Sequence, residues 1–107
     1  MNNKKHERVT ETIAHEAARF IEEAASDQSL ITVTRALPSA KGDRMTVFVT
    51  VFSEAQEGPA IAFLARQREA FSDHLKSHAR IAPLPRVDFE IDAGEKARRH
   101  LEELSGS

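Results

Sequence analysis

Two runs of β-forming residues lie near the middle of the chain and are separated by a short polar break. The runs are residues 30–37 (LITVTRAL) and 45–52 (MTVFVTVF). The break contains Pro38 and Gly42, which favour a turn over continued strand pairing. We therefore predict two neighbouring strands joined by a turn, and this limits the chain to folds that contain a sheet.

A third β-type run, residues 87–92 (VDFEID), lies much further along the chain. Its apolar and acidic residues alternate, which predicts a strand with one face buried and the other in water. The run 45–52 carries apolar residues on both faces and would promote aggregation if it were exposed. We therefore expect residues 45–52 to form an inner strand.

Helical spacing precedes the first strand. Apolar residues recur at intervals of three, four and one over about residues 5–25, the pattern of one helix stripe; they are Val9, Ile13, Ala17, Phe20, Ile21 and Ala24. The charged residues between them, Glu16 included, are expected on a solvated face. Residues 26–29 (SDQS) are predicted to be the loop that ends this helix.

A second helical region lies between the second and third strands. Pro59 suits a first helical turn, and Pro83 and Pro85 end helical structure. The apolar spacing is interrupted near residues 67–69, which leaves open one kinked helix or two helices. After Gly94, the spacing of Ala97, Leu101 and Leu104 predicts a short final helix, with residues 105–107 frayed.

Composition sets further limits. The 107 residues suit one domain, taken as 1–107 with a core of about 5–104. The chain has no cysteine, which excludes disulfides and thiolate metal sites. We expect no signal peptide and no membrane span, and hence a cytoplasmic protein. The net charge of −2 lacks the positive excess typical of nucleic-acid-binding domains.

The charge is nevertheless sorted along the chain. Residues 66–86 hold five basic residues against two acidic ones, whereas residues from 88 onward hold six acids against three bases. The basic residues, Arg66, Arg68, Lys76, Arg80 and Arg86, are candidates for contacts with RNA phosphates. Lys41 and Arg44 in the strand connection are further candidates. The alternative is a solvated helix face without a ligand.

His74 and His78 have the spacing that lets two imidazoles share a metal on one helix face. A zinc site needs further ligands, and no Glu follows His74 as in a His-Glu-x-x-His pattern. We therefore expect no metal and no cofactor, and we expect both histidines to face solvent. No glycine-rich phosphate loop and no nucleophile motif is present, so we predict a protein that is not an enzyme. A minor alternative is an enzyme that uses His74 or His78 as a base.

The order helix–strand–strand–helix–helix–strand is that of type II KH-like domains. Three stretches, residues 8–13, residues 31–35 with 47–51, and residues 75–89, resemble the ribosome-binding factor A family. The resemblance covers roughly Arg8 to Leu104. It implies an α+β fold with a three-stranded sheet and helices packed on one face. It also implies a monomeric factor that binds the small ribosomal subunit and its rRNA, with contacts to ribosomal proteins, and assists late rRNA maturation.

Two departures from related proteins concern glycine and charge. KH domains that grip single-stranded RNA use a Gly-x-x-Gly loop, and the resembled family has an Ala-x-Gly kink between the paired helices. This chain has Gln67-Arg68-Glu69 at the matching positions. The missing glycine and the acidic balance would allow an alternative, a protein-interaction module that has lost RNA binding, with a partner face around Phe48 and Phe52.

Overall fold

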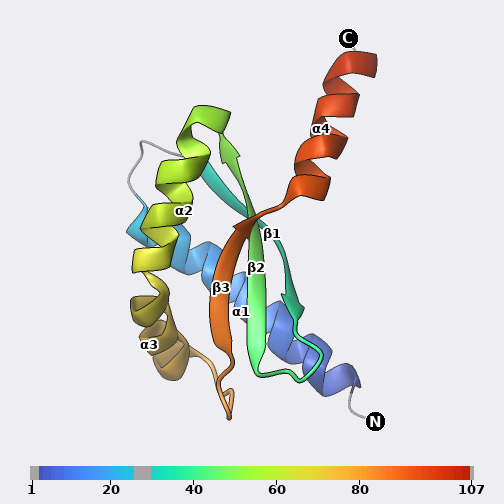
Figure 1. Cartoon of the computed structure of the whole chain (residues 1–107). Coiled ribbons are helices and arrows are strands. Elements are labelled where there is room, and N and C mark those ends of the chain that lie inside the picture. Colours follow the sequence, from blue (N-terminus) through green and yellow to red (C-terminus); the bar gives the residue numbers. More distant parts are fainter. Residues whose placement is uncertain (1–2, 26–29, 107) are drawn as a thin grey trace.

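The structure is a computed structural model that describes residues 3–25 and 30–106. Its elements follow in the predicted order (Figure 1): α1 (Asn3–Ala24), β1 (Leu30–Pro38), β2 (Arg44–Phe52), the 3-10 turn η1 (Glu54–Gln56), α2 (Glu57–Arg66), α3 (Arg68–His78), β3 (Arg86–Ile91) and α4 (Ala93–Ser105). The predicted loop at 26–29 and the chain end at Ser107 lie outside the described residues. No described helix is long and apolar enough to cross a membrane.

The three strands form one mixed sheet in the order β1-β2-β3. β1 pairs with β2 in antiparallel fashion, and β2 pairs with β3 in parallel. The prediction that residues 45–52 form an inner strand is therefore confirmed. The register of the β1–β2 ladder shifts between Val33 and Arg35, so that Arg35 lies opposite Phe48.

The turn between β1 and β2 closes through backbone hydrogen bonds. The Ser39 amide donates to the Arg44 carbonyl at 3.0 Å, and the Gly42 amide donates to the Ser39 carbonyl at 2.9 Å. Gly42 has a φ of +74°, a conformation that glycine adopts without the strain that a side chain would add. This glycine lets the hairpin turn sharply, with Lys41 at its tip.

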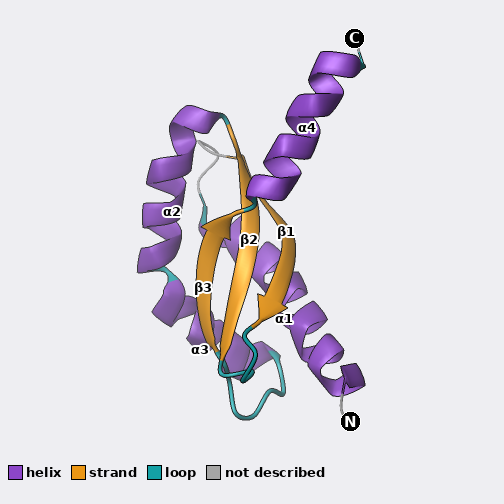
Figure 2. Cartoon of the chain, turned by 45° about the vertical axis from the view of Figure 1, so that its right-hand side comes forward, coloured by secondary structure: helices purple, strands orange, loops and turns teal. Residues whose placement is uncertain are grey.

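Helices α1, α2 and α3 pack on one face of the sheet, and the other face is left uncovered (Figures 1 and 2). The apolar sides of β2 and of these helices form the core; its largest fully buried side chains are Phe71, Ile13, Leu64, Leu75, Val47 and Val49. The predicted α+β, KH-like class with helices on one face is thus confirmed. Burial of these side chains is the main stabilising contribution, at about 1.5–3 kcal/mol for each large one.

Helix α4 departs from this packing. It extends beyond one end of the sheet (Figures 1 and 2), and its contact with another helix is the ion pair of Lys96 with Glu57 of α2, at 3.0 Å. It spans 13 residues and buries none of them. Asp92 caps its N-terminus, because the carboxylate accepts a hydrogen bond from the Glu95 amide at 3.0 Å.

Candidate nucleic-acid interface

Three predicted basic residues gather where the β1–β2 turn meets the start of β3. Arg44 and Arg86 are partners in the parallel ladder, and the Arg86 amide donates to the Asp43 carbonyl at 3.0 Å. Lys41 lies in the same turn, and all three side chains are exposed. None of the three forms an ion pair with a described residue. We call Lys41, Arg44 and Arg86 the basic end; their charges are available to an anionic ligand.

A fourth predicted residue belongs to a neighbouring segment. The connection from α3 to β3, residues 79–85, reaches the same end of the sheet as the β1–β2 turn (Figure 1). It carries Arg80, which is exposed and makes no ion pair within the described chain. The fold thus brings the strand connection and part of the 66–86 stretch to one end of the molecule.

The other three predicted basic residues lie on α2 and α3. The guanidinium of Arg68 is held by Asp88, with Nη1 2.7 Å from Oδ1. Lys76 Nζ lies 3.9 Å from Asp73 Oδ1, and both side chains are largely exposed. Arg66 is exposed and has no ion pair with a described residue. Arg68 is therefore committed to an internal contact.

The junction of α2 and α3 answers the question that the sequence left open: there are two helices, separated at Gln67. The Gln67 amide is shared between the carbonyls of Phe63 and Leu64, at 3.1 and 3.0 Å, and the Gln67 carbonyl accepts from the Phe71 amide at 2.8 Å. Its φ of −91° is open to any residue. The break therefore forms without the glycine that the resembled family has here.

His74 and Glu16 correct two predictions. Both were expected to face solvent, but Glu16 is buried and His74 is nearly so, with Nε2 2.8 Å from Glu16 Oε1. The hydrogen bond from His74 lowers the pKa of Glu16, against the effect of burial. Of the two histidines predicted to face solvent, His78 alone is exposed, and its ring stacks on that of His74 at 4.1 Å between centroids.

This pair joins α1 to α3. Glu16 lies three residues after Ile13 and four before Phe20, so helical spacing places it in the buried stripe of α1. That spacing is the sequence signal that a charge-based interpretation missed. Among the described residues, no group of three or more His, Cys, Asp or Glu is arranged to hold a metal ion.

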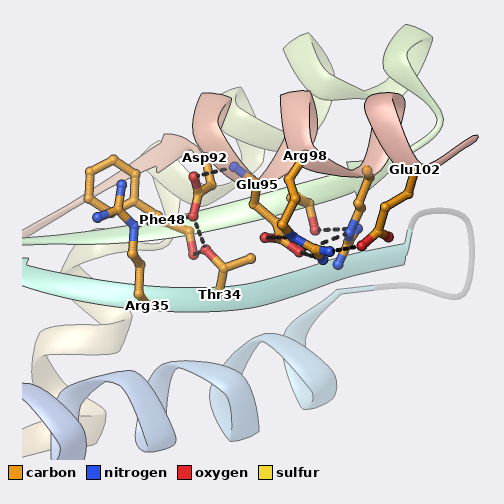
Figure 3. A network of polar contacts seen from close by, with 9 residues as sticks. Thr34, Arg35, Phe48, Asp92, Glu95, Arg98 and Glu102 are labelled. Atoms are coloured by element: carbon orange, nitrogen blue, oxygen red, sulfur yellow. Dashed lines mark hydrogen bonds and ion pairs between the residues drawn. The ribbon is translucent and has the colours of Figure 1, made fainter. Parts of the chain in front are cut away.

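Asp92 corrects a third prediction, since alternation had placed it on the water-facing side of β3. It is buried, and Oδ2 lies 2.6 Å from Thr34 Oγ1 and accepts from Arg35 Nε at 3.2 Å (Figure 3). The hydrogen bond from Thr34, followed by the bond from the Glu95 amide, lowers the pKa of Asp92. The spacing of Asp92 and Glu95 resembles a capping box, and this signal predicts the cap.

The uncovered face of the sheet does not offer one continuous aromatic patch. The Arg35 guanidinium carbon lies 4.4 Å from the centroid of the Phe48 ring, which is half-buried (Figure 3). Phe52 is 75% exposed and lines a groove next to α4, of which Phe48 is not part. The two phenylalanines expected to share a partner face therefore have separate surroundings.

These features define a KH-like α+β domain with a mixed three-stranded sheet, a helix pair broken without glycine, and free cations at one end. Comparison with solved structures confirms the resemblance to ribosome-binding factor A. The crystal structure of ribosome-binding factor A from Thermus thermophilus is similar over 78% of this chain and 92% of that one, with a TM-score of 0.69 and 25% identity.

A second Thermus thermophilus ribosome-binding factor A model, fitted into a cryo-EM map of a 30S complex, covers 75% of this chain and 87% of its own, with a TM-score of 0.65 and 26% identity. The solution structure of a Thermotoga maritima protein shares the fold, with a TM-score of 0.61 and 15% identity over 81% and 82% of the two chains. No family model matches the chain. No curated protein matches it either.

Proposed function

We propose that this protein is a cytoplasmic, non-catalytic assembly factor that binds the small ribosomal subunit and its rRNA and assists a late step of rRNA maturation. The observation that carries the proposal is the basic end. Lys41, Arg44 and Arg86 are exposed, adjacent and free of ion pairs with described residues. The similarity to a protein fitted into a 30S complex supports the choice of partner.

The basic end acts by neutralising phosphates. Each cation that contacts a phosphate releases condensed counterions, so the affinity falls as salt rises. With Arg80, four cations are available at this end, and the logarithm of affinity should fall with that of salt with a slope of roughly three to four. Arg66 and Lys76 are further candidates on α2 and α3, whereas Arg68 stays with Asp88.

The chain acts on RNA structure through binding energy alone. A protein that binds one RNA conformation more tightly than another shifts the population toward the first by its difference in affinity. Such a role requires a rigid, correctly spaced set of cations, and the parallel β2–β3 ladder supplies it by fixing Arg44 beside Arg86. No reacting group is needed.

The proposal is tested by sedimentation of the protein with small ribosomal subunits across a salt series. We expect Lys41→Glu/Arg44→Glu/Arg86→Glu to bind at least about 100-fold more weakly than the native chain, with a shallower salt slope. The matched control is Arg19→Glu/Arg98→Glu/Arg99→Glu, which changes the net charge equally on α1 and α4. Equal losses in both variants, or none in the first, would contradict the proposal.

The same series separates this function from the protein-interaction alternative. A module that docks on a ribosomal protein through apolar contacts would keep its affinity at high salt, because the hydrophobic effect is not screened. A flat salt dependence with intact binding would therefore favour that alternative.

A further inference from the structure

The uncovered face of the sheet carries a groove that continues from the basic end. It has a volume of about 550 Å³ and crosses all three strands. The side chains that line it include Leu37 of β1, Arg44, Thr46 and Phe48 of β2, and Asp88 and Glu90 of β3. Arg44 belongs both to the groove and to the basic end, so the two form one surface.

The β2–β3 ladder orders the side chains along this groove. Arg44 pairs with Arg86 and, two rows further along, Phe48 pairs with Glu90. Alternate residues of a strand point to the same face, so both rows lie on the uncovered face. Arg44 and Phe48 are about 13 Å apart along β2. The groove therefore has cations at one end and a ring beside a carboxylate at the other.

The Phe48 ring is held in place by its neighbours. The Arg35 guanidinium lies over the ring, with its carbon 4.4 Å from the ring centroid (Figure 3). Arg35 Nε in turn donates to the buried Asp92 carboxylate at 3.2 Å. A ring that is already fixed loses little conformational entropy when a ligand binds against it. Phe48 thus offers a prepared surface at the edge of the groove for a flat ring such as a nucleobase.

Glu90 supplies a free acceptor at the same end. Its side chain is exposed and forms no ion pair with a described residue, whereas the Asp88 carboxylate is held by Arg68. A free carboxylate repels phosphate, so this end of the groove favours a base over the RNA backbone. Guanine presents its N1–H and N2–H donors side by side, which match the two oxygens of a carboxylate. Uracil presents a single N–H between two carbonyl groups.

We propose that this groove binds one unpaired guanine nucleotide of RNA, with its phosphate at the basic end, its base stacked on Phe48 and its N1–H and N2–H donated to Glu90. The inference rests on the proposed function and names the base that the protein reads. The cations position the strand, and the carboxylate specifies the base. An apolar segment of a protein would leave both the basic end and Glu90 without a partner.

The site is separate from the break between α2 and α3. The helices pack on one face of the sheet, and the groove lies on the other (Figures 1 and 2). KH domains that grip single-stranded RNA place their Gly-x-x-Gly loop between the paired helices. The absence of that glycine motif from this chain therefore has no bearing on the groove.

Equilibrium titration at low salt tests the base preference, with short oligouridylates that each carry one central guanosine, cytidine, adenosine or uridine. The native chain should bind the guanosine oligomer at least about tenfold more tightly than the uridine oligomer. Glu90→Gln should lose most of this preference, because an amide offers one acceptor oxygen. Glu69→Gln, the matched control, removes the same charge from an exposed site on α3 and should retain the preference. A native chain without the preference, or a Glu90→Gln variant that keeps it, would overturn the proposal.

A second pair of variants tests the stacking surface. Phe48→Leu keeps an apolar side chain but removes the ring, and it should weaken binding of the guanosine oligomer at least about fivefold. Phe52→Leu is the matched control, since Phe52 lies on the same strand, is 75% exposed and does not line this groove. Circular dichroism verifies that both variants are folded. Equal affinities of the two variants would show that the base does not stack on Phe48.

Sedimentation with small ribosomal subunits separates failure of this site from failure of the proposed function. Glu90→Gln and Phe48→Leu leave the basic end intact, so both should keep the native salt slope while they bind less tightly. Subunit binding that depends on the basic end but is unchanged in both groove variants would reject this site alone. Subunit binding that depends on Phe48, with all four oligomers bound alike, would assign the groove to a ribosomal protein and overturn the proposal.

Discussion

Helices α1 and α4 both carry an apolar stripe at helical spacing, but the stripe is buried in α1 and exposed in α4. The α1 residues Ile13, Ala17 and Ile21 are at most 2% exposed, whereas Leu101 and Leu104 of α4 are about two-thirds exposed. Both stripes follow helical spacing, so the pattern identifies the apolar face equally well in each. It does not identify what covers that face, because covering depends on residues distant in the chain.

The polar contacts that hold the two helices also differ, in where they lie on each helix. We call Glu16 with His74, and Asp92 with Thr34, the polar anchors of α1 and α4. Glu16 meets His74 from the side of α1, and the His74 ring packs against the rings of Phe20 and Phe71. Asp92 holds α4 from its end, through the cap and through Thr34. α1 is thus held mainly by apolar burial, whereas α4 is held by polar contacts, which include Lys96 with Glu57 of α2 and Arg99 with Thr50 of β2.

Truncation of one apolar residue in each helix gives the largest contrast. Ile13→Ala should lower the free energy of unfolding by about 2–5 kcal/mol, because it opens a cavity at a fully buried site. Leu101→Ala should change it by no more than about 0.5 kcal/mol. Urea unfolding measures both. Similar losses would show that α4 is covered within one chain.

The second prediction concerns acid, which should weaken both polar anchors. The pKa values of Glu16 and Asp92 are lowered from the ordinary 4.5 and 3.8. A carboxylate with a depressed folded-state pKa contributes stability that is complete above its ordinary pKa and is lost as pH falls through the folded-state pKa. Unfolding free energies measured from neutral pH downward should therefore decline below about pH 4.5.

Neutral variants separate the two contributions. Glu16→Gln and Asp92→Asn should each be less stable near pH 7 and should each decline less in acid than the native chain. Asn retains N-cap capacity, so Asp92→Asn tests the charge and not the cap. A native acid profile reproduced by both variants would mean that other carboxylates control the response.

The smallest expected effect is at the break between α2 and α3, within the helices that pack on the sheet. Gln67→Gly should destabilise the chain by about 0.5–1 kcal/mol, because glycine adds freedom to the unfolded state and the φ of −91° does not require it. Gln67→Ala, the control, should be close to neutral. Thermal unfolding of both variants measures the difference, and a more stable glycine variant would show that the break is strained.

Local patterns were sufficient for the architecture. Alternation over residues 87–92, the turn at Gly42 and the three-to-four spacing of α1 each arise within a short window, since they reflect the geometry of one element. The apolar residues on both faces of residues 45–52 predicted the inner position of β2, and the family resemblance implied that the helices pack on one face. The capping spacing of Asp92 and Glu95 was also present in the sequence, although alternation alone placed Asp92 in water.

Contacts between distant segments account for the rest. The sequence does not distinguish Arg68 from the free basic residues near it. In the fold, β3 places Asp88 Oδ1 2.7 Å from Arg68 Nη1. Glu16 was buried because α3 supplied His74, and Arg44 met Arg86 because β2 and β3 run in parallel. The charge of a side chain is a local property, but its partner and its exposure depend on which segments packing brings together.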